Sequence, residues 1–150
     1  VPKTLVRYLV DYVSSLYKGQ VLETILQDVL DTPVSPELLP QEDDKIVQKT
    51  EDIVGPYELH DFFIYHMVRF GDEPRKLYKK TKLAFKDKYD KDTIKKWLRL
   101  FYWRFFSQQF KRSCIPDGPK VGSVALSPRG DWRMPSDANV QIWLDEVERI

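Results

Sequence analysis

Residues 94–106 read IKKWLRLFYWRFF, and this stretch indicates how the chain folds. Its apolar side chains recur every three or four positions, which is the spacing of one face of an α-helix. Lysine and arginine side chains occupy the other face. Aromatic residues at this spacing usually form core, so the sequence predicts an amphipathic helix with a buried aromatic face. The expected core positions are Ile94, Trp97, Leu98, Phe101, Tyr102, Phe105 and Phe106.

Similar spacing elsewhere predicts further helices. They cover about residues 2–16, 21–30 and 57–70, a lysine-rich segment from Pro74, and about 136–149. The helix over 57–70 is apolar on nearly every side, so we expect it to lie centrally. Asp92 is the expected cap of the aromatic helix. Because no segment alternates with a period of two, the chain as it stands is predicted to be mainly α.

Composition is that of a globular protein. The 150 residues are 42% hydrophobic and 31% charged, which excludes a disordered or collagen-like chain, and no stretch is apolar enough to span a membrane. The one cysteine, Cys114, excludes an intrachain disulfide and fits a reducing compartment, so we expect a cytoplasmic protein. His60 and His66 would project about 120° apart on a helix, which makes them a poor metal pair. No catalytic triad stands out.

Charge is unevenly distributed, although the net charge is only +1. Residues 37–61 carry eight acidic residues against two lysines, a net of −6. Residues 69–112 carry fifteen basic against five acidic residues, a net of +10. A basic helical segment with aromatic residues is one signature of a nucleic-acid-binding module. The aromatic residues lie on the apolar stripe rather than among the lysines, which favours a core role; a helical protein-interaction module is the other alternative.

Two proline-rich segments interrupt the helices, at about residues 31–54 and 110–137. Proline excludes a helix interior and a central strand, so both are predicted loops. The second segment carries Lys111, Arg112, Asp131, Trp132 and Arg133. Preorganised cations beside an aromatic ring suit a ligand that combines phosphate with a flat ring. The alternative is that an ion pair between Asp131 and a nearby arginine merely pins the loop.

Five runs occur in order along the chain: VPKTL at 1–5, DTPVSPEL at 31–38, VGPYELHDF at 54–62, QFKRS at 109–113 and ALSPRGDWR at 125–133. Together they resemble the C-terminal part of the synthetase domain of glutamine-dependent NAD synthetases. The resemblance implies a portion of a Rossmann-like α/β domain of the adenine-nucleotide hydrolase type, usually dimeric, with deamido-NAD bound at the subunit interface. It also implies a ligase that uses ATP and Mg²⁺ to adenylate deamido-NAD, after which glutamine-derived ammonia displaces AMP to give NAD.

The resemblance assigns roles to individual residues. It implies that Lys3 meets the ATP phosphates and that Ser35, in a mobile loop over about 31–54, lies near Mg²⁺ and pyrophosphate. It places deamido-NAD at Lys111, Asp131 and Arg133, within substrate loops over about 110–137. Three positions carry no such assignment: Glu51 and Asp52 close the acidic end of the mobile loop, and Phe110 departs from the histidine of the ammonia-dependent enzymes.

Two parts of such an enzyme have no match in the chain. The Ser-Gly-Gly-x-Asp-Ser loop that holds the ATP pyrophosphate is absent, and Cys114 does not stand in the context of a glutaminase nucleophile. We therefore expect a truncated portion that is inactive alone. Its expected partners are deamido-NAD, ATP, ammonia, the remaining synthetase and glutaminase domains and further copies in a homo-oligomer, with neither nucleic acid nor membrane.

Overall fold

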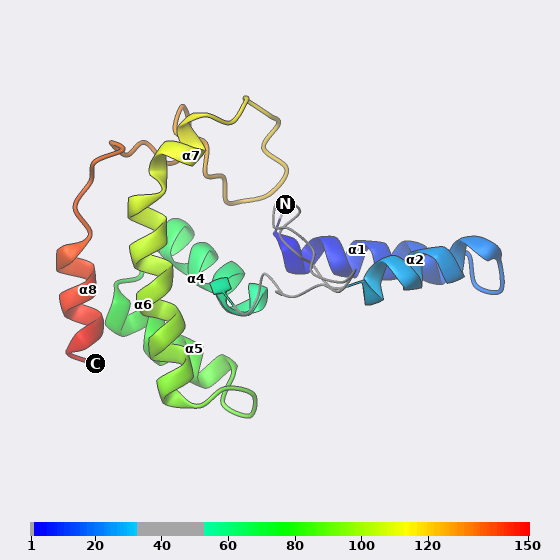
Figure 1. Cartoon of the computed structure of the whole chain (residues 1–150), viewed down its shortest axis with the longest axis horizontal. Coiled ribbons are helices and arrows are strands. Elements are labelled where there is room, and N and C mark those ends of the chain that lie inside the picture. Colours follow the sequence, from blue (N-terminus) through cyan, green and yellow to red (C-terminus); the bar gives the residue numbers. More distant parts are fainter. Residues whose placement is uncertain (1, 33–52) are drawn as a thin grey trace, which may run out of the picture. The chain divides into compact units, whose positions relative to one another are not determined.

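The computed structural model describes residues 2–32 and 53–150, and within these ranges the regular elements are helices without a strand. They are α1 (Lys3–Leu16), α2 (Val21–Asp31), α4 (Tyr57–Phe70), α5 (Pro74–Ala84), α6 (Lys91–Ser107), α7 (Gln109–Ser113) and α8 (Gln141–Glu148), labelled in Figure 1. The prediction of a mainly α chain is confirmed. None of the described helices is long and apolar enough to cross a membrane.

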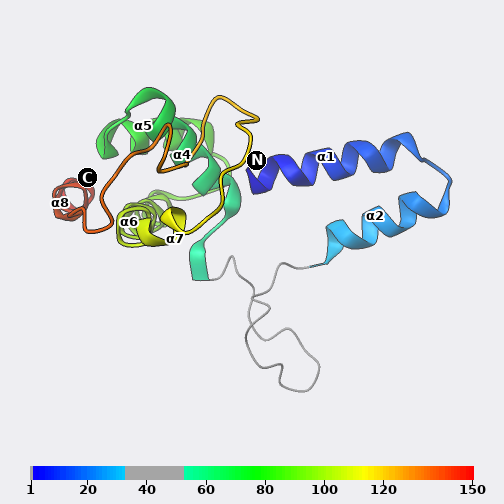
Figure 2. The same ribbon diagram turned by 90° about the horizontal axis from the view of Figure 1, so that it is seen from above.

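The chain divides into two compact units, the N-terminal unit Val1–Glu58 and the C-terminal unit Leu59–Ile150. In the N-terminal unit α1 and α2 contact each other and form the two arms of a helical hairpin (Figure 2). The chain reverses at Gly19, whose positive φ of 79° favours glycine. The Gly19 amide donates to Glu23 Oε2 at 2.6 Å, which ties the turn to the first residues of α2.

The C-terminal unit is built around α6, against which α5, α7 and α8 pack. Its core lies where α4, α5, α6 and α8 meet, and α6 supplies the largest share of the buried side chains. The core residues are Leu59, Phe63, Met67, Leu77, Tyr78, Ile94, Leu98, Phe101, Tyr102, Phe105, Phe106, Leu144 and Val147. Of the seven core positions expected on α6, six are buried and Trp97 is partly buried against the cluster.

The aromatic face of α6 is core, as its spacing predicts. The Phe101 ring lies 5.4 Å from that of Phe63, and Tyr102 stacks on Trp143 of α8 with centroids 5.7 Å apart. Burial raises the pKa of the Tyr102 hydroxyl, as expected for a phenol removed from water. Rings held in this way cannot stack on bases, so the geometry does not favour a nucleic-acid-binding module.

Three expectations about the helices are wrong in detail. Helix α4 is not central: Leu59, Phe63 and Met67 are buried, but Tyr65 and Phe70 are 44% and 54% exposed. Phe62, Ile64 and Val68 also lie against the core cluster, so the helix is open only on the side that carries Tyr65 and Phe70. The apolar pattern around a helix does not specify how many neighbours the fold supplies.

The cap of α6 is Asp90 rather than Asp92. Its Oδ1 accepts from the Thr93 amide at 2.8 Å. Thr93 is the third residue of the helix, and its amide has no acceptor within the helix. Helix α8 begins at Gln141, five residues later than expected. Asn139 accepts from the Gln141 amide at 2.7 Å, a local bond that competes with helix formation over the preceding residues.

Candidate functional site

The candidate site is the loop that follows α7 and runs to the start of α8. Between Ser113 and Gln141 the chain forms turns and irregular backbone but no helix or strand, as its proline and glycine content predicts. It leaves the same end of α6 that carries Phe105, and it contains Asp131 and Arg133, with Lys111 just before it on α7. Its shape therefore depends on how it is attached to α6 and α7.

Gln109 and Arg112 make that attachment. Gln109 is fully buried; its Nε2 donates to Met134 O at 3.0 Å, and its Oε1 accepts from Arg112 Nε at 2.7 Å. Arg112 also donates to Phe105 O, and its guanidinium lies 4.2 Å above the Phe105 ring. Burial lowers the pKa of Arg112 below its ordinary value, but that value is so high that the side chain stays charged at neutral pH. Arg112 is therefore a structural cation.

Trp132 adds an apolar attachment. Its ring meets the Phe105 ring edge-on, with centroids 5.2 Å apart and planes at 78°. The Gly130 amide closes the turn over residues 127–130 by donating to Ser127 O at 3.2 Å, and the Trp132 amide donates to the same oxygen at 3.1 Å. The indole thus packs on the core, in contrast to the stacking role for a flat ligand ring that the sequence suggested.

Arg129 joins the two arms of the loop. Its Nε lies 2.6 Å from Asp117 Oδ1, and its Nη2 and Nη1 donate to the carbonyls of Ile115 and Ser113 at 2.5 and 3.4 Å. One planar guanidinium thus satisfies a carboxylate and two backbone acceptors, which suits the fork geometry of arginine. A lysine could not reproduce these three contacts.

Asp131 pairs with Lys120, a second contact between the arms. An ion pair does tie down the aspartate, but the expected arginine partner is wrong, since Arg129 bonds Asp117 instead. Sequence reasoning assigned no role to Lys120 or Asp117. These pairs are eleven and twelve residues apart, and no periodicity signals them because their meeting depends on loop closure. Gln109 and Arg112 do stand at helical i, i+3 spacing, which could have indicated their contact.

Three of the residues expected at a substrate site lie in this region. Lys111 is exposed and forms no side-chain bond within the described part of the chain. Arg133 is exposed and makes one weak bond, from Nη2 to Arg129 O at 3.4 Å. The Asp131 side chain is 39% exposed beside Lys120. These three residues therefore present two cations and one paired carboxylate on a braced backbone, an arrangement able to bind an anionic ligand with hydroxyl groups.

The other expected site residues lie elsewhere. Lys3 is exposed in the N-terminal unit, at the first residue of α1, whose first turn contains no acidic side chain. The positive end of the helix dipole and a lysine are compatible with a phosphate group. Residues 33–52 of the predicted mobile loop fall outside the described residues. They include Ser35, Glu51 and Asp52.

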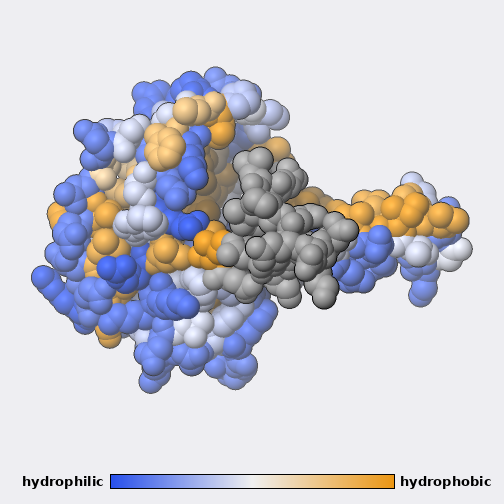
Figure 3. All heavy atoms as spheres, viewed as in Figure 1, coloured by the Kyte–Doolittle hydropathy of each residue, from blue (hydrophilic) through white to orange (hydrophobic). Residues whose placement is uncertain are grey.

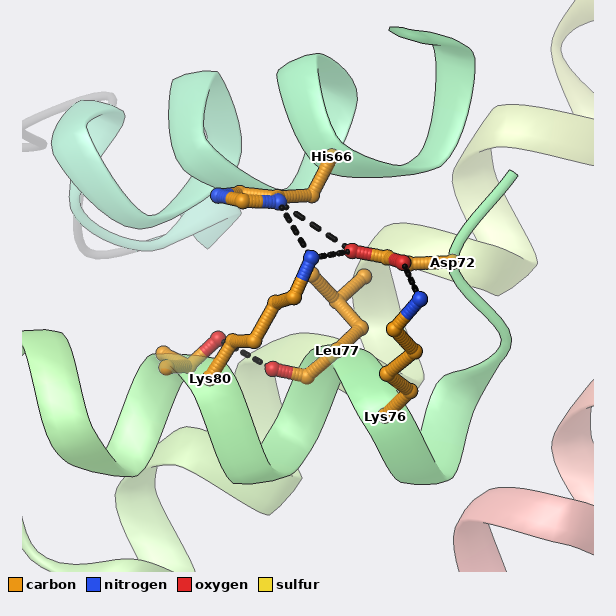
Figure 4. Close-up of polar contacts among 6 residues, drawn as sticks. His66, Asp72, Lys76, Leu77 and Lys80 are labelled. Carbon is orange, nitrogen blue, oxygen red and sulfur yellow. Dashed lines mark hydrogen bonds and ion pairs between the residues drawn. The ribbon is translucent and has the colours of Figure 1, made fainter. Parts of the chain in front are cut away.

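A second polar cluster surrounds Asp72, between α4 and α5 (Figure 4). Its carboxylate is buried, with Lys76 Nζ 2.7 Å from Oδ1, His66 Nδ1 3.1 Å from Oδ2, and Lys80 bonded to Oδ2. Burial alone would raise the pKa of Asp72, but hydrogen bonds from Lys76 and Lys80 lower it from 3.8 to about 2. A carboxylate with cations on both oxygens stabilises the fold and is poorly suited to act as a general base. Across residues 2–32 and 53–150, no group of three His, Cys, Asp or Glu side chains could hold a metal ion.

Replacing Asp72 with Asn should destabilise the C-terminal unit by about 2 kcal/mol at neutral pH. Because folding lowers the pKa of Asp72 from 3.8 to about 2, its contribution is complete above about pH 4 and disappears as the pH falls toward 2. Denaturation of both proteins at several pH values should therefore show curves that converge in acid. Asp87→Asn, at an exposed position, is the control and should change little. A difference that persists at pH 2 would contradict the assignment.

Comparison with known proteins points to the family that the sequence motifs suggested, although no family model matches the chain. Curated synthetases, however, are similar to it over 99% of its length. It is 44% identical over 169 residues to the glutamine-dependent NAD(+) synthetase of Mycobacterium leprae. It is 40% identical over 168 residues to the enzymes of that name from Mycobacterium bovis and Mycobacterium tuberculosis.

The chain is thus homologous to one portion of glutamine-dependent NAD(+) synthetases, which confirms the resemblance predicted from its sequence. It spans about a quarter of the length of these relatives, since each alignment covers 25% of the longer protein.

Proposed function

We propose that this chain forms part of a cytoplasmic glutamine-dependent NAD(+) synthetase, a ligase that amidates deamido-NAD. The observation that carries the proposal is identity of 40–44% over 99% of the chain to enzymes of that name. The braced loop that follows α7 supports it, because the residues expected to meet deamido-NAD are exposed there on a fixed backbone.

The chemistry explains the need for such a loop. A carboxylate is a poor electrophile, and adenylation by ATP turns it into a mixed anhydride that ammonia can attack. Charge accumulates on the transferring phosphorus group and on the pyrophosphate that leaves, so cations must surround them. Water must also be kept from the acyl-adenylate, which favours an ordered loop over a mobile one.

In this proposal the loop binds the substrate dinucleotide. Lys111 and Arg133 supply positive charge to its phosphates or carboxylate, and Asp131 accepts hydrogen bonds from its hydroxyl groups. The ion pair with Lys120 orients Asp131, and Arg129 holds the backbone that carries it. Arg112 contributes indirectly, by fixing α7 and therefore the base of the Lys111 side chain.

The other expected site residues, Lys3 and Ser35, are proposed to contact ATP and Mg²⁺. Lys3, exposed at the start of α1, would meet the phosphates, and Ser35 would approach Mg²⁺ and pyrophosphate. When bound, the metal neutralises charge on the pyrophosphate as it departs. The other synthetase and glutaminase parts would supply the remaining ATP contacts and the ammonia, in a homo-oligomer of a Rossmann-like domain. The chain alone is therefore expected to be inactive.

The test is a chimera in which this chain replaces the matching quarter of the Mycobacterium leprae enzyme. We expect the chimera to form NAD from deamido-NAD, ATP and glutamine, and the isolated chain to form none. Lys111→Met and Arg133→Met should each raise the KM for deamido-NAD about tenfold or more, the effect of losing one charge-assisted bond.

Lys79→Met is the matched control, since Lys79 is an exposed lysine on α5, and it should leave that KM unchanged. A folded chimera without activity would refute the proposed function. An unchanged KM in both loop variants would refute the substrate role of the loop, and synthesis by the isolated chain would refute its incompleteness.

A further inference from the structure

The hairpin of α1 and α2 exposes an unusual amount of apolar surface. Figure 3 shows hydrophobic residues along one side of it and hydrophilic residues along the other. Within the two helices only Ser14 is buried. Besides Val21 at the first residue of α2, six large side chains are each at least 50% exposed: Tyr8, Leu9, Tyr12, Leu16, Ile25 and Val29. Together they expose roughly 600 Å² of apolar surface, the upper end of what a monomer usually displays in one patch.

The two helices meet partly through polar groups. Gln27 Nε2 donates to Ser14 Oγ at 2.9 Å and approaches Asp11 Oδ1 at 3.5 Å, while Ser14 Oγ donates to Glu23 O at 3.5 Å. A hairpin that folds to bury its own apolar stripe would place leucine and valine at these positions. Here the polar seam leaves most of the apolar side chains pointing away from the partner helix.

The apolar arc is also wide. At about 100° per residue, the apolar side chains of α1 between Leu5 and Leu16 span about 200° of its circumference, and those of α2 about 180°. One helix packed against another covers a much narrower stripe. An arc of this width is typical of an element enclosed on more than one side, as in an inner layer of a larger domain.

We propose that this apolar face docks on the part of the synthetase polypeptide that the chain lacks. The proposal rests on the proposed function: the relatives are about four times longer, so most of the protein that could cover the hairpin lies outside this chain. The partner is an apolar surface on that remaining polypeptide. The hairpin is thus an attachment element, separate from the loop expected to bind the substrate.

Thiol accessibility tests the docking. In a Cys114→Ser background, which removes the one exposed native cysteine, Leu9→Cys reports on the apolar face and Thr24→Cys on the exposed polar face. We expect both thiols to react at similar rates in the isolated chain at all protein concentrations. In the chimera with the Mycobacterium leprae enzyme, Leu9→Cys should react about tenfold or more slowly, with Thr24→Cys unchanged.

Three other outcomes would overturn the docking. Slow reaction of Leu9→Cys in the isolated chain at every concentration would mean that the chain covers its own hairpin, and protection only at high concentration would indicate a second copy. Unslowed reaction in a folded chimera would exclude the missing polypeptide as partner. A protected hairpin in a chimera that forms no NAD would instead refute the proposed function and leave the docking in place.

A second variant keeps the proposal testable if the chimera does not fold. Leu9→Asp places a charge on a face that should be uncovered in the isolated chain, so helix content and stability of that chain should be unchanged within about 0.5 kcal/mol. A large loss of helix would show that the face is already packed within the chain, and would contradict the proposal.

Discussion

Leu98→Ala should lower the free energy of unfolding of the C-terminal unit by about 3–4 kcal/mol. Leu98 is fully buried on α6, in the cluster that joins α4, α5, α6 and α8. Truncation removes its contacts and leaves a cavity that rigid aromatic neighbours cannot readily fill. The expected loss is a large fraction of the stability of a unit of this size, since small domains are only marginally stable.

Urea denaturation followed by tryptophan fluorescence measures this change directly. The four tryptophans are Trp97, Trp103, Trp132 and Trp143, and all lie in the C-terminal unit, so the N-terminal hairpin does not contribute to the signal. Leu83→Ala is the matched control: Leu83 is 77% exposed on α5, and its truncation should change stability by less than about 0.5 kcal/mol. Equal effects of the two substitutions would show that α6 is not the centre of the core.

Gln109→Leu should release the loop that follows α7 and destabilise the C-terminal unit by about 2–3 kcal/mol. Leucine fills similar space but can neither donate to Met134 O nor accept from Arg112 Nε. Arg112 would then lose a partner for a charge that is largely removed from water, which is a more severe loss than that of a neutral bond.

Limited proteolysis distinguishes the loop from the core. Trypsin should cleave after Lys120 or Arg129 several-fold faster in Gln109→Leu than in the wild-type protein, because the attachment of the loop at Met134 is lost. The control is Gln141→Leu, in which an exposed glutamine bonded to Asp145 within its own helix is replaced. If Gln109→Leu were cleaved no faster than the control, the buried glutamine would not be what holds the loop.

The helices could be predicted from local pattern, whereas their ends could not. The α6 stripe contains seven apolar positions at helical spacing, and its burial follows from that spacing. The choice between Asp90 and Asp92 as cap, and the late start of α8 at Gln141, depend on single hydrogen bonds. Such bonds are worth about 1 kcal/mol, too little for a pattern to resolve.

Only part of the candidate site could likewise be predicted from the sequence. The types and order of its residues could be read from the runs around Lys111 and Arg133. The expected irregular loop is confirmed over residues 114–137, but its predicted start at about residue 110 is wrong, because Lys111 lies in the short helix α7. The role of Arg112 could not be predicted from the sequence. Its sequence neighbours do not distinguish a cation that binds a ligand from one that packs against Phe105. Only the packed structure separates the two.

By itself, the sequence determined that this chain is helical, that α6 carries the core, and that the chain is related to glutamine-dependent NAD(+) synthetases. Periodicity and ordered motifs are local properties, so they survive without knowledge of the fold. Only the tertiary structure decided that Asp131 pairs with Lys120, that Arg129 bonds Asp117, and that the hairpin presents its apolar face outward. Those features depend on how distant segments approach, and loop closure and helix packing are not written in the spacing of neighbouring residues.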